Sequence, residues 1–367
     1  MKSWTHYDQP ALEAELRDRG YKPSHARRLL RALYDANGEL DLNAVEIPKT
    51  LRAELRRAIA PRLTTVLTRH TSADGTIKLL LGLTPTRGGG SVETVLMPGF
   101  RDGVAAGCVS SQVGCAMGCD FCASTVGGLE RNLDAGEIVE QFLRLRAEAA
   151  RLGRRLKTLV FMGMGEPLNN LANVVPAIRR IADPEMGGLG RRQITVSTVG
   201  IVPGIDALAA ADLNVHVALS LHAPDDVTRA RLVPMNRRWK VADVMAAARR
   251  FQARTGRIVT IEYCLLAGVN DSDDQARLLA DLMSGFPAHV NVIPYNPTGP
   301  GVSGASYERP TPQTVARFVG LLRDAGVVAH VRVTRGVDVA AACGQLRQAS
   351  ADAGLGRTDR RTALPVL

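Results

Sequence analysis

Three cysteines, Cys115, Cys119 and Cys122, stand within eight positions in the segment GCAMGCDFCAST. The chain has 367 residues and six cysteines, so half of its cysteines lie in this C-x3-C-x2-C pattern. Cysteine thiolates hold iron–sulfur clusters, and a cluster with four irons normally takes four of them. Three thiolates leave one iron open to bind and activate another molecule. The spacing therefore predicts a 4Fe-4S cluster with one open iron.

A structural zinc site is the alternative for the same cysteines. Such a site has four closed ligands, usually as two spaced pairs, and Cys108, seven residues before Cys115, is a possible fourth ligand. The chain would then be a zinc-stabilised RNA-binding protein without catalysis. However, the sequence has no second C-x2-C pair, and the triplet follows directly on an apolar run typical of a strand. Both observations favour the cluster.

Six short apolar runs, typical of buried strands, follow one another from about residue 104 and would position these residues. Helical patterns lie between them, and strands that alternate with helices form parallel β/α units. We therefore expect an α/β fold, an incomplete (β/α)6 barrel, with its active site at the carboxyl ends of the strands. The cysteines, GEP, SLH and YNP all fall at such ends. The runs are GVAAGCVSS, TLVFMGMG, QITVSTVG, VHVALSLHAP, IVTIEYCLL and VNVIPYNP.

The helical pattern after the cysteines shows the expected amphipathic spacing. In AGEIVEQFLRLRAEAARL, apolar residues recur every three or four positions on one face, which predicts that this face packs on the barrel. These residues are Ile138, Phe142, Leu145, Ala149 and Leu152.

The rest of the chain divides by composition into smaller parts. Residues 1–65 show three helical patterns punctuated by Gly20, Gly38 and prolines, which predicts a small helical unit. Over 66–103, GTIKLLLGL and SVETVLMP flank the turn-rich TPTRGGG, which predicts a β-hairpin. The barrel is expected over 104–347, with a last strand-like run, VVAHVRVTRG, and a loop that carries Cys343. Residues 348–367 are expected to be a flexible tail.

The charge of the chain favours a polyanionic partner. The formal net charge is +10, although an arginine-rich composition would by itself give the same value. Aromatic residues make up 4% of the chain, so contact of Arg and Lys with phosphate is favoured over base stacking. No apolar run approaches the roughly 18 residues of a membrane span. The first residues carry charges where a signal peptide has its apolar core, so we expect a cytoplasmic protein.

Seven motifs together resemble the RlmN/Cfr family of RNA adenine methyltransferases, within the radical S-adenosylmethionine superfamily. They are CVSSQVGCAMGCDFC, RNLDAGEIVEQ, GMGEPLNN, STVG, SLHAP, IPYNP and AACGQL, and the resemblance extends from about residue 10 to 347. It implies that Cys115, Cys119 and Cys122 hold a 4Fe-4S cluster whose open iron binds S-adenosylmethionine. Two molecules of S-adenosylmethionine would be used per turnover.

The resemblance also implies how S-adenosylmethionine is held. Gly165 and Glu166, in GMGEPLNN, match the motif that binds its methionine amino group. His222 alone would more often be a structural, hydrogen-bonding histidine. The positions that match the nucleoside site of the family are Ser197, Ser220, Leu221, His222 and Asn296.

The resemblance assigns the catalytic roles to three residues. A thiolate is a good nucleophile and can take a methyl group from S-adenosylmethionine. By resemblance, Cys343 is the methyl carrier, Cys108 the resolving thiol and Glu93 the base. Without the family, Glu93 would be interpreted as an exposed strand carboxylate. A lone cysteine is usually a small buried apolar residue, which suits Cys264 in IEYCLL and fits Cys343, in AACGQL, poorly.

The implied activity is methylation of adenine carbon 2 in 23S ribosomal RNA and in transfer RNA. Methylation of carbon 8, as in the Cfr branch, shares every motif and is the alternative. The helical unit resembles the RNA-binding domain of the family, but its SHARR replaces an aromatic–Arg–Ala–Lys–Gln run, with Arg28 in place of Gln. The expected partners are RNA and an electron donor such as flavodoxin, and the expected form is a monomer.

Overall fold

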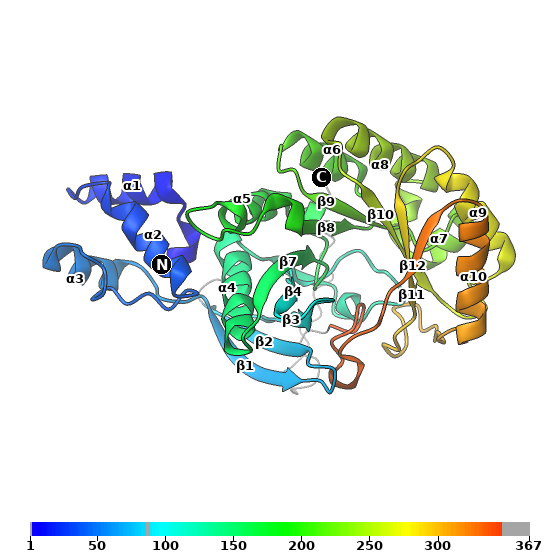
Figure 1. The fold of residues 1–367 in the computed structure, drawn as a ribbon, viewed down its shortest axis with the longest axis horizontal. Coiled ribbons are helices and arrows are strands. Elements are labelled where there is room, and N and C mark those ends of the chain that lie inside the picture. Colours follow the sequence, from blue (N-terminus) through cyan, green and yellow to red (C-terminus); the bar gives the residue numbers. More distant parts are fainter. Residues whose placement is uncertain (1, 86–87, 347–367) are drawn as a thin grey trace.

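A computed structural model describes residues 2–85 and 88–346 of the protein. A small helical unit projects from one side of a larger α/β body (Figure 1). The predicted tail, 348–367, lies outside the described residues. Within the described ranges, no helix is long and apolar enough to cross a membrane.

The helical unit contains the three helices that the sequence predicts: α1 (Gln9–Asp18), α2 (His25–Asp35) and α3 (Lys49–Ala58). The carboxylate of Asp8 caps α1, because it accepts a hydrogen bond from the Ala11 N–H at 2.9 Å. Pro48 and Pro61 enclose α3, as expected of residues that cannot donate a helical hydrogen bond.

The antiparallel half of the sheet consists of β1 (Thr64–Thr71), β2 (Ile77–Leu83) and β3 (Ser91–Pro98). The antiparallel pairing of β2 with β3 confirms the predicted hairpin. The strand β1 was not expected. Thr64 is its one buried residue, so its sequence lacks the alternation of apolar and polar residues that marks a half-buried strand.

The parallel half begins at β4 (Val104–Cys108), which pairs antiparallel with β3 and parallel with β7. All six predicted strands are present, and the run VVAHVRVTRG contributes a seventh parallel strand, β12, beside β11. The further strands are β7 (Arg155–Phe161), β8 (Ile194–Thr198), β9 (His216–Ser220), β10 (Val259–Leu265), β11 (His289–Pro294) and β12 (Val328–Val331).

Together these strands form one ten-stranded sheet in the described residues, in the order β1-β2-β3-β4-β7-β8-β9-β10-β11-β12. Since β1 and β12 are its two ends, the sheet curves without closing, which confirms the predicted incomplete barrel. Helices cover the outer face of its parallel half (Figure 1). They are α4 (Ala135–Arg151), α5 (Leu171–Ala182), α6 (Val202–Ala210), α7 (Asp226–Leu232), α8 (Val241–Thr255), α9 (Asp273–Met283) and α10 (Pro312–Asp324).

The helix α4 packs against both the helical unit and the barrel. Its predicted apolar face is buried at Ile138, Phe142, Leu145 and Ala149. The prediction for Leu152 was wrong: α4 ends at Arg151, so Leu152 leaves that face and is 43% exposed. At the other end, His6 from the N-terminal segment lies 3.1 Å from the Asp134 carboxylate that caps α4.

Candidate active site

A cavity of about 930 Å³, including the part open to solvent, lies at the carboxyl ends of the parallel strands. Barrels of this type carry their active sites at this end. Four of the predicted site residues, Glu93, Cys108, Leu221 and Asn296, do not line it. The predicted residues that do are Cys115, Cys119, Cys122, Gly165, Glu166, Ser197, Ser220, His222 and Cys343.

The three clustered cysteines lie on one loop, which a small antiparallel pair of strands closes. The strands β5 (Gln112–Gly114) and β6 (Leu129–Asn132) pair across its base. The Cys115 N–H donates to the Gly128 carbonyl at 2.9 Å. At Gly114 the φ angle is 73°, and a Cβ atom would lie 1.9 Å from the Gly128 oxygen, so this crossing requires glycine.

Asp120 anchors the same loop to the segment after β11. Its carboxylate accepts hydrogen bonds from the Ser303 N–H and hydroxyl, at 2.7 and 2.6 Å, and from the Tyr307 hydroxyl at 2.6 Å. The Thr298 hydroxyl donates to the Phe121 carbonyl at 3.2 Å. These bonds restrict the backbone between Cys119 and Cys122, so two of the three thiols are held by contacts far away in the sequence.

The thiols of this loop fit an iron–sulfur cluster. Burial raises the pKa of Cys115 to about 12, and it raises the pKa of Cys122 as well. Burial, then the charges of Cys122 and Cys115, raise the pKa of Cys119. Burial thus keeps the three thiols protonated until a cationic group binds, and the iron of an iron–sulfur cluster would stabilise their thiolate forms. Among the described residues, no three His, Cys, Asp or Glu side chains surround a single metal-ion position.

Glu166 follows β7 and presents a buried carboxylate to the cavity. Its two oxygens accept hydrogen bonds from the Val199 N–H at 2.9 Å and the Leu168 N–H at 3.0 Å. Burial nevertheless raises the pKa of Glu166 to about 7. An ammonium group placed against this carboxylate would favour its ionised form, so the site suits an amino group.

The glycines before Glu166 permit a close backbone crossing. A Cβ atom at Gly163 would lie 2.6 Å from the Ser110 hydroxyl oxygen. At Gly165, whose φ angle is 97°, it would lie 2.5 Å from Cβ of Gln112. Gln112 in turn accepts from the Glu166 N–H at 2.8 Å. The glycines therefore bring the end of β7 against the start of the cysteine loop.

Ser197, near the end of β8, and Ser220, at the end of β9, lie side by side in the cavity lining. Their hydroxyl oxygens are 3.4 Å apart. His222 has both a structural partner and a place in the lining, since its Nδ1 accepts from the Cys264 N–H at 3.0 Å. Burial, then the charge of Arg229, lower the pKa of His222 to about 3, so the ring is neutral.

Leu221 and Asn296 do not line the cavity but form hydrogen bonds with residues next to it. The Leu221 N–H donates to the Glu262 carbonyl at 3.1 Å, which continues the β9–β10 pairing beyond Ser220. Asn296 donates from Nδ2 to the Cys343 carbonyl at 3.4 Å. In this structure Asn296 therefore contacts the loop that carries Cys343.

Cys343 is half-buried on a loop that docks onto the cysteine loop. The Gly344 carbonyl accepts from the Ala123 N–H at 2.8 Å, and the Leu346 carbonyl accepts from the Ser124 hydroxyl at 2.8 Å. Gln345 donates to the Pro297 carbonyl at 3.0 Å. The cavity thus brings Cys343 together with three cysteines more than 200 residues earlier in the chain.

Cys108, at the end of β4, is a buried free thiol near Cys343. Burial, and next the charge of Cys343, raise the pKa of Cys108 to about 12. Arg332, just after β12, lines the cavity with Cys343 and lies 3.5 Å from the Glu262 carboxylate. The charge of Cys343, and then those of Glu262 and Cys108, raise the pKa of Arg332. The charge of Arg332 lowers the pKa of Cys108 and so partly opposes the effect of burial.

Glu93 lies in β3 and is 7% exposed, so it is not the exposed strand carboxylate that its sequence alone suggested. Its Oε1 lies 2.8 Å from Nζ of Lys78, on the neighbouring strand β2. Lys78 was not among the predicted site residues, although it is the one charged residue in the apolar run GTIKLLLGL. Arg332 was not predicted either, although it lies in the strand-like run VVAHVRVTRG.

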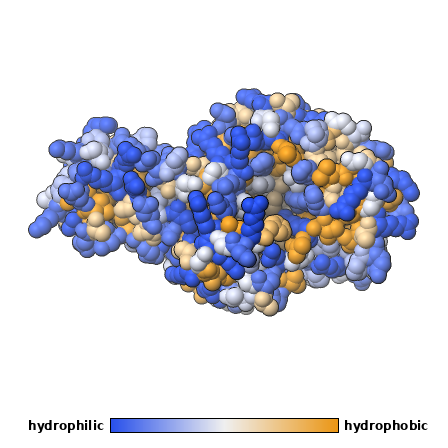
Figure 2. All heavy atoms as spheres, in the orientation of Figure 1, coloured by the Kyte–Doolittle hydropathy of each residue, from blue (hydrophilic) through white to orange (hydrophobic). Residues whose placement is uncertain are grey.

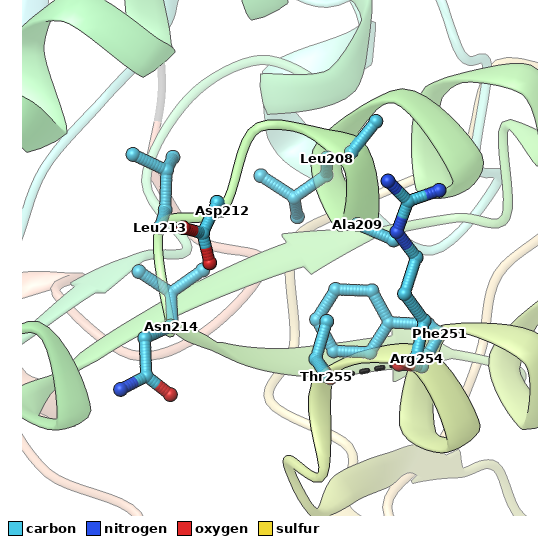
Figure 3. A pocket seen from close by; sticks show the side chains of 10 residues that line it. Leu208, Ala209, Asp212, Leu213, Asn214, Phe251, Arg254 and Thr255 are labelled. Carbon is cyan, nitrogen blue, oxygen red and sulfur yellow. Dashed lines mark hydrogen bonds between the residues drawn. The ribbon is translucent and has the colours of Figure 1, made fainter.

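A second pocket, of about 570 Å³ including its open part, lies between the ends of α6 and α8 (Figure 3). Figure 3 shows the Arg254 side chain on one side and the Asp212 carboxylate on the other, around the Phe251 ring. None of the predicted site residues lines this pocket. The chemistry of the chain is therefore concentrated in the cysteine cavity.

Comparison with known proteins places this site in a family. Residues 109–280 match the radical SAM superfamily. A probable dual-specificity RNA methyltransferase RlmN 1 of Opitutus terrae is 58% identical over 328 residues, which are 89% of this chain and 92% of that protein. A dual-specificity RNA methyltransferase RlmN of Acidiphilium cryptum is 42% identical, over 93% of this chain and 88% of its own.

A solved structure shows the same fold. The crystal structure of a radical SAM methyltransferase from Sphaerobacter thermophilus superposes with a TM-score of 0.88 at 43% identity. The match covers 95% of this chain and 99% of that one. With relatives this similar along nearly its whole length, the chain belongs to the RlmN family of the radical SAM superfamily.

Proposed function

We propose that the protein is a radical S-adenosylmethionine methyltransferase that methylates carbon 2 of adenine in 23S ribosomal RNA and in transfer RNA. The observation that carries the proposal is the cavity that Cys115, Cys119, Cys122 and Cys343 line together. Relatives that are 42–58% identical bear the name dual-specificity RNA methyltransferase, which supports RNA as the substrate.

The radical SAM superfamily uses a 4Fe-4S cluster and S-adenosylmethionine, which supply a methyl group and a radical when bound. In this chain Cys115, Cys119 and Cys122 would hold the cluster, and Glu166 would accept from the amino group. Ser197, Ser220 and His222 would bind the nucleoside, while Leu221 continues the β9–β10 pairing and Asn296 holds the Cys343 loop. Two molecules of S-adenosylmethionine are used per turnover.

Cys343 acts as a nucleophile, because its thiolate takes the methyl group and the carbon–sulfur bond of the donor breaks. The S-methyl group of Cys343 then loses one hydrogen atom to the radical that the cluster and S-adenosylmethionine would supply, and the remaining carbon bonds to carbon 2 of adenine. The ring C–H bond then breaks, its proton goes to the Glu93 carboxylate, and the unpaired electron of the adduct would return to the cluster. The Cys108 thiolate attacks the Cys343 sulfur, so that a disulfide forms. The carbon–sulfur bond to RNA breaks with its electron pair on carbon, which takes up a proton and becomes the methyl group.

Mass spectrometry of RNA nucleosides tests the proposal. The reconstituted enzyme, reduced by flavodoxin or a chemical reductant, is expected to convert adenosine in 23S ribosomal RNA and transfer RNA to 2-methyladenosine. Formation of 8-methyladenosine would instead place the protein in the Cfr branch. RNA without any methylated adenosine would overturn the proposal. We also propose that the enzyme is a cytoplasmic monomer.

The crossing at Gly165 provides a specific test of S-adenosylmethionine binding. In Gly165→Ala the new Cβ atom would overlap Gln112, and overpacking of this kind costs about 1–3 kcal/mol. Relief of the overlap displaces Glu166, so affinity for S-adenosylmethionine should fall about tenfold for each 1.4 kcal/mol. Equilibrium dialysis with the reconstituted protein measures this affinity.

Gly188→Ala is the matched control for Gly165→Ala. The φ angle of Gly188 is 66°, also in the left-handed region, but nothing lies within 4 Å of the added Cβ atom. Both variants bear the left-handed strain, of about 1–2 kcal/mol, and only Gly165→Ala should lose affinity. Equal affinity in the two variants would contradict the role of the β7 end in binding.

The helical unit, residues 1–65, is the proposed RNA-binding domain. Its surface is mostly hydrophilic (Figure 2), and α2 and α3 carry exposed arginines that can neutralise phosphates. Each contact between an arginine and an RNA phosphate that is lost should reduce the slope of log affinity against log salt concentration by about 0.9 for duplex-like RNA. The variant to compare with wild type in a filter-binding titration combines Arg→Gln at Arg28, Arg31, Arg56 and Arg57.

A second set of exposed arginines supplies the control for this titration. Changing four arginines to Gln on α8, α9 and α10 removes the same charge from the far side of the barrel. This control should keep the wild-type slope. An equal loss in both variants would show that overall charge, and not the helical unit, determines RNA affinity. The control residues are Arg254, Arg277, Arg317 and Arg323.

A further inference from the structure

We propose that Lys78 is a positioning residue that joins the two halves of the reaction centre. Its ammonium group positions the carboxylate of Glu93, the proposed base, and it anchors the backbone of the loop that carries Cys343. This inference rests on the proposed function.

The ion pair between Lys78 and Glu93 is short and buried. Nζ of Lys78 lies 2.8 Å from Oε1 of Glu93, and the two side chains are 11% and 9% exposed. The strands β2 and β3 pair antiparallel with Leu80 opposite Glu93, so Lys78 reaches the carboxylate diagonally from two residues along β2. Such a position is set by the strand register and cannot be reached from the other face of the sheet.

The ion pair restricts where the Glu93 carboxylate lies, because a charge-assisted hydrogen bond of this length fixes its geometry. A general base must lie within hydrogen-bond reach of the proton that it removes. Removing Lys78 should therefore affect proton removal more than the earlier transfer of a methyl group to Cys343.

The same ammonium group also reaches the Cys343 loop. Nζ of Lys78 donates to the Ala340 carbonyl at 3.2 Å, three residues before Cys343. Ala340 has a φ angle of 51°, a left-handed conformation that is strained for a residue with a side chain. The start of this loop is also held on the antiparallel half, where the Ala73 N–H donates to the Asp338 carboxylate at 3.0 Å.

Lys78 therefore contacts both the proposed base and the segment that carries the adduct. When the adenine ring is joined to Cys343, the ring C–H bond must meet the Glu93 oxygen for its proton to transfer. The bonds from one ammonium group to Glu93 and to Ala340 fix the base relative to the loop. We therefore infer that Lys78 aligns the Glu93 carboxylate with the ring proton.

The test compares single-turnover reactions of the reconstituted Lys78→Met, Glu93→Gln and Lys78→Met/Glu93→Gln variants with RNA. Lys78→Met should still methylate Cys343, as peptide mass spectrometry shows, but release methylated RNA about 100-fold more slowly or worse, the usual loss when a general base is removed. Protein-bound RNA should accumulate in Lys78→Met as in Glu93→Gln. The double variant should release RNA no more slowly than Glu93→Gln alone.

Two further variants complete the test. Lys78→Arg keeps a cation beside Glu93 and should recover part of the release rate. Lys157→Met, which removes a lysine of β7 that does not line the cavity, should release RNA at the wild-type rate. Release at the wild-type rate by Lys78→Met would overturn the inference. If wild type itself methylated no adenosine, the proposed function would fail instead.

Lys78→Gln distinguishes the positioning role from a role in folding. It keeps a donor that can reach the Ala340 carbonyl but lacks the charge, so it should retain iron and also accumulate protein-bound RNA. Loss of iron from both Lys78→Met and Lys78→Gln would assign Lys78 to folding and would overturn the inference.

Discussion

Replacing Cys108 by Ala is expected to stop turnover and to leave RNA covalently attached to Cys343. The Cys108 thiol is buried at the end of β4 and close enough to Cys343 for their charges to interact. It lies outside the cavity lining and outside the C-x3-C-x2-C loop, so the variant should keep its cluster and bind S-adenosylmethionine. Methyl transfer to Cys343 and addition to adenine should therefore proceed.

The release step is the one that the variant lacks. The bond between Cys343 and adenine opens by attack of a thiolate on sulfur, and without Cys108 no proposed residue supplies that thiolate. A denaturing gel should show a protein band shifted to higher mass, and ribonuclease should return it to the position of the free protein. Product release should fall to background.

Three further cysteine variants give this result its controls. Cys343→Ala and the Cys108→Ala/Cys343→Ala double variant should show no shifted band, because neither carries the methyl group. Cys264→Ala removes another buried free thiol, one that does line the cavity, unlike Cys108, and it should not trap RNA. Normal turnover by Cys108→Ala would exclude the two-cysteine mechanism for this protein.

Replacing Cys115, Cys119 or Cys122 by Ala should abolish the cluster and with it every later step. Only three thiols lie on this loop, so a missing one cannot be replaced by a neighbour in the same segment. Each Ala variant should lose nearly all of its iron and sulfide after anaerobic reconstitution. Reductive cleavage of S-adenosylmethionine should fall to the background rate, because the open iron is lost.

The matched comparison for the cluster is again Cys108→Ala. It should bind the same amount of iron and sulfide as wild type and show the same visible absorption. Loss of the cluster in Cys108→Ala would make Cys108 a fourth ligand and contradict the ligand assignment. Binding of zinc in place of iron by the wild-type protein would favour the non-catalytic alternative.

Local patterns in the sequence were sufficient for the strands and for most of the cavity. A short apolar run followed by a glycine or polar segment indicates a buried strand and its carboxyl end. Parallel strands present these carboxyl ends at one edge of the sheet. For this reason the cysteines after β4, GEP after β7 and SLH after β9 were predicted to meet, and Cys115, Glu166 and Ser220 all line the cavity. Ser197, near the end of β8, also lines it, but only the family resemblance had indicated that residue.

The same reasoning failed where burial did not follow the local pattern. The strand β1 was missed because its residues after Thr64 are exposed. Leu152 continued the apolar spacing of α4, but the helix ends one residue earlier, so the spacing no longer describes its position. Element ends depend on hydrogen bonds at the cap, and apolar spacing does not report them.

The sequence by itself therefore determined the family, the cysteine pattern, the incomplete barrel and the strand ends that line the cavity. The tertiary structure decided which charges stand beside the reactive groups. Lys78 meets Glu93 through the register of β2 and β3, and Arg332 pairs with Glu262, 70 positions earlier in the chain, in the lining of the cavity. These contacts arise from strand pairing and barrel curvature, which act over distances that no local spacing of residues encodes.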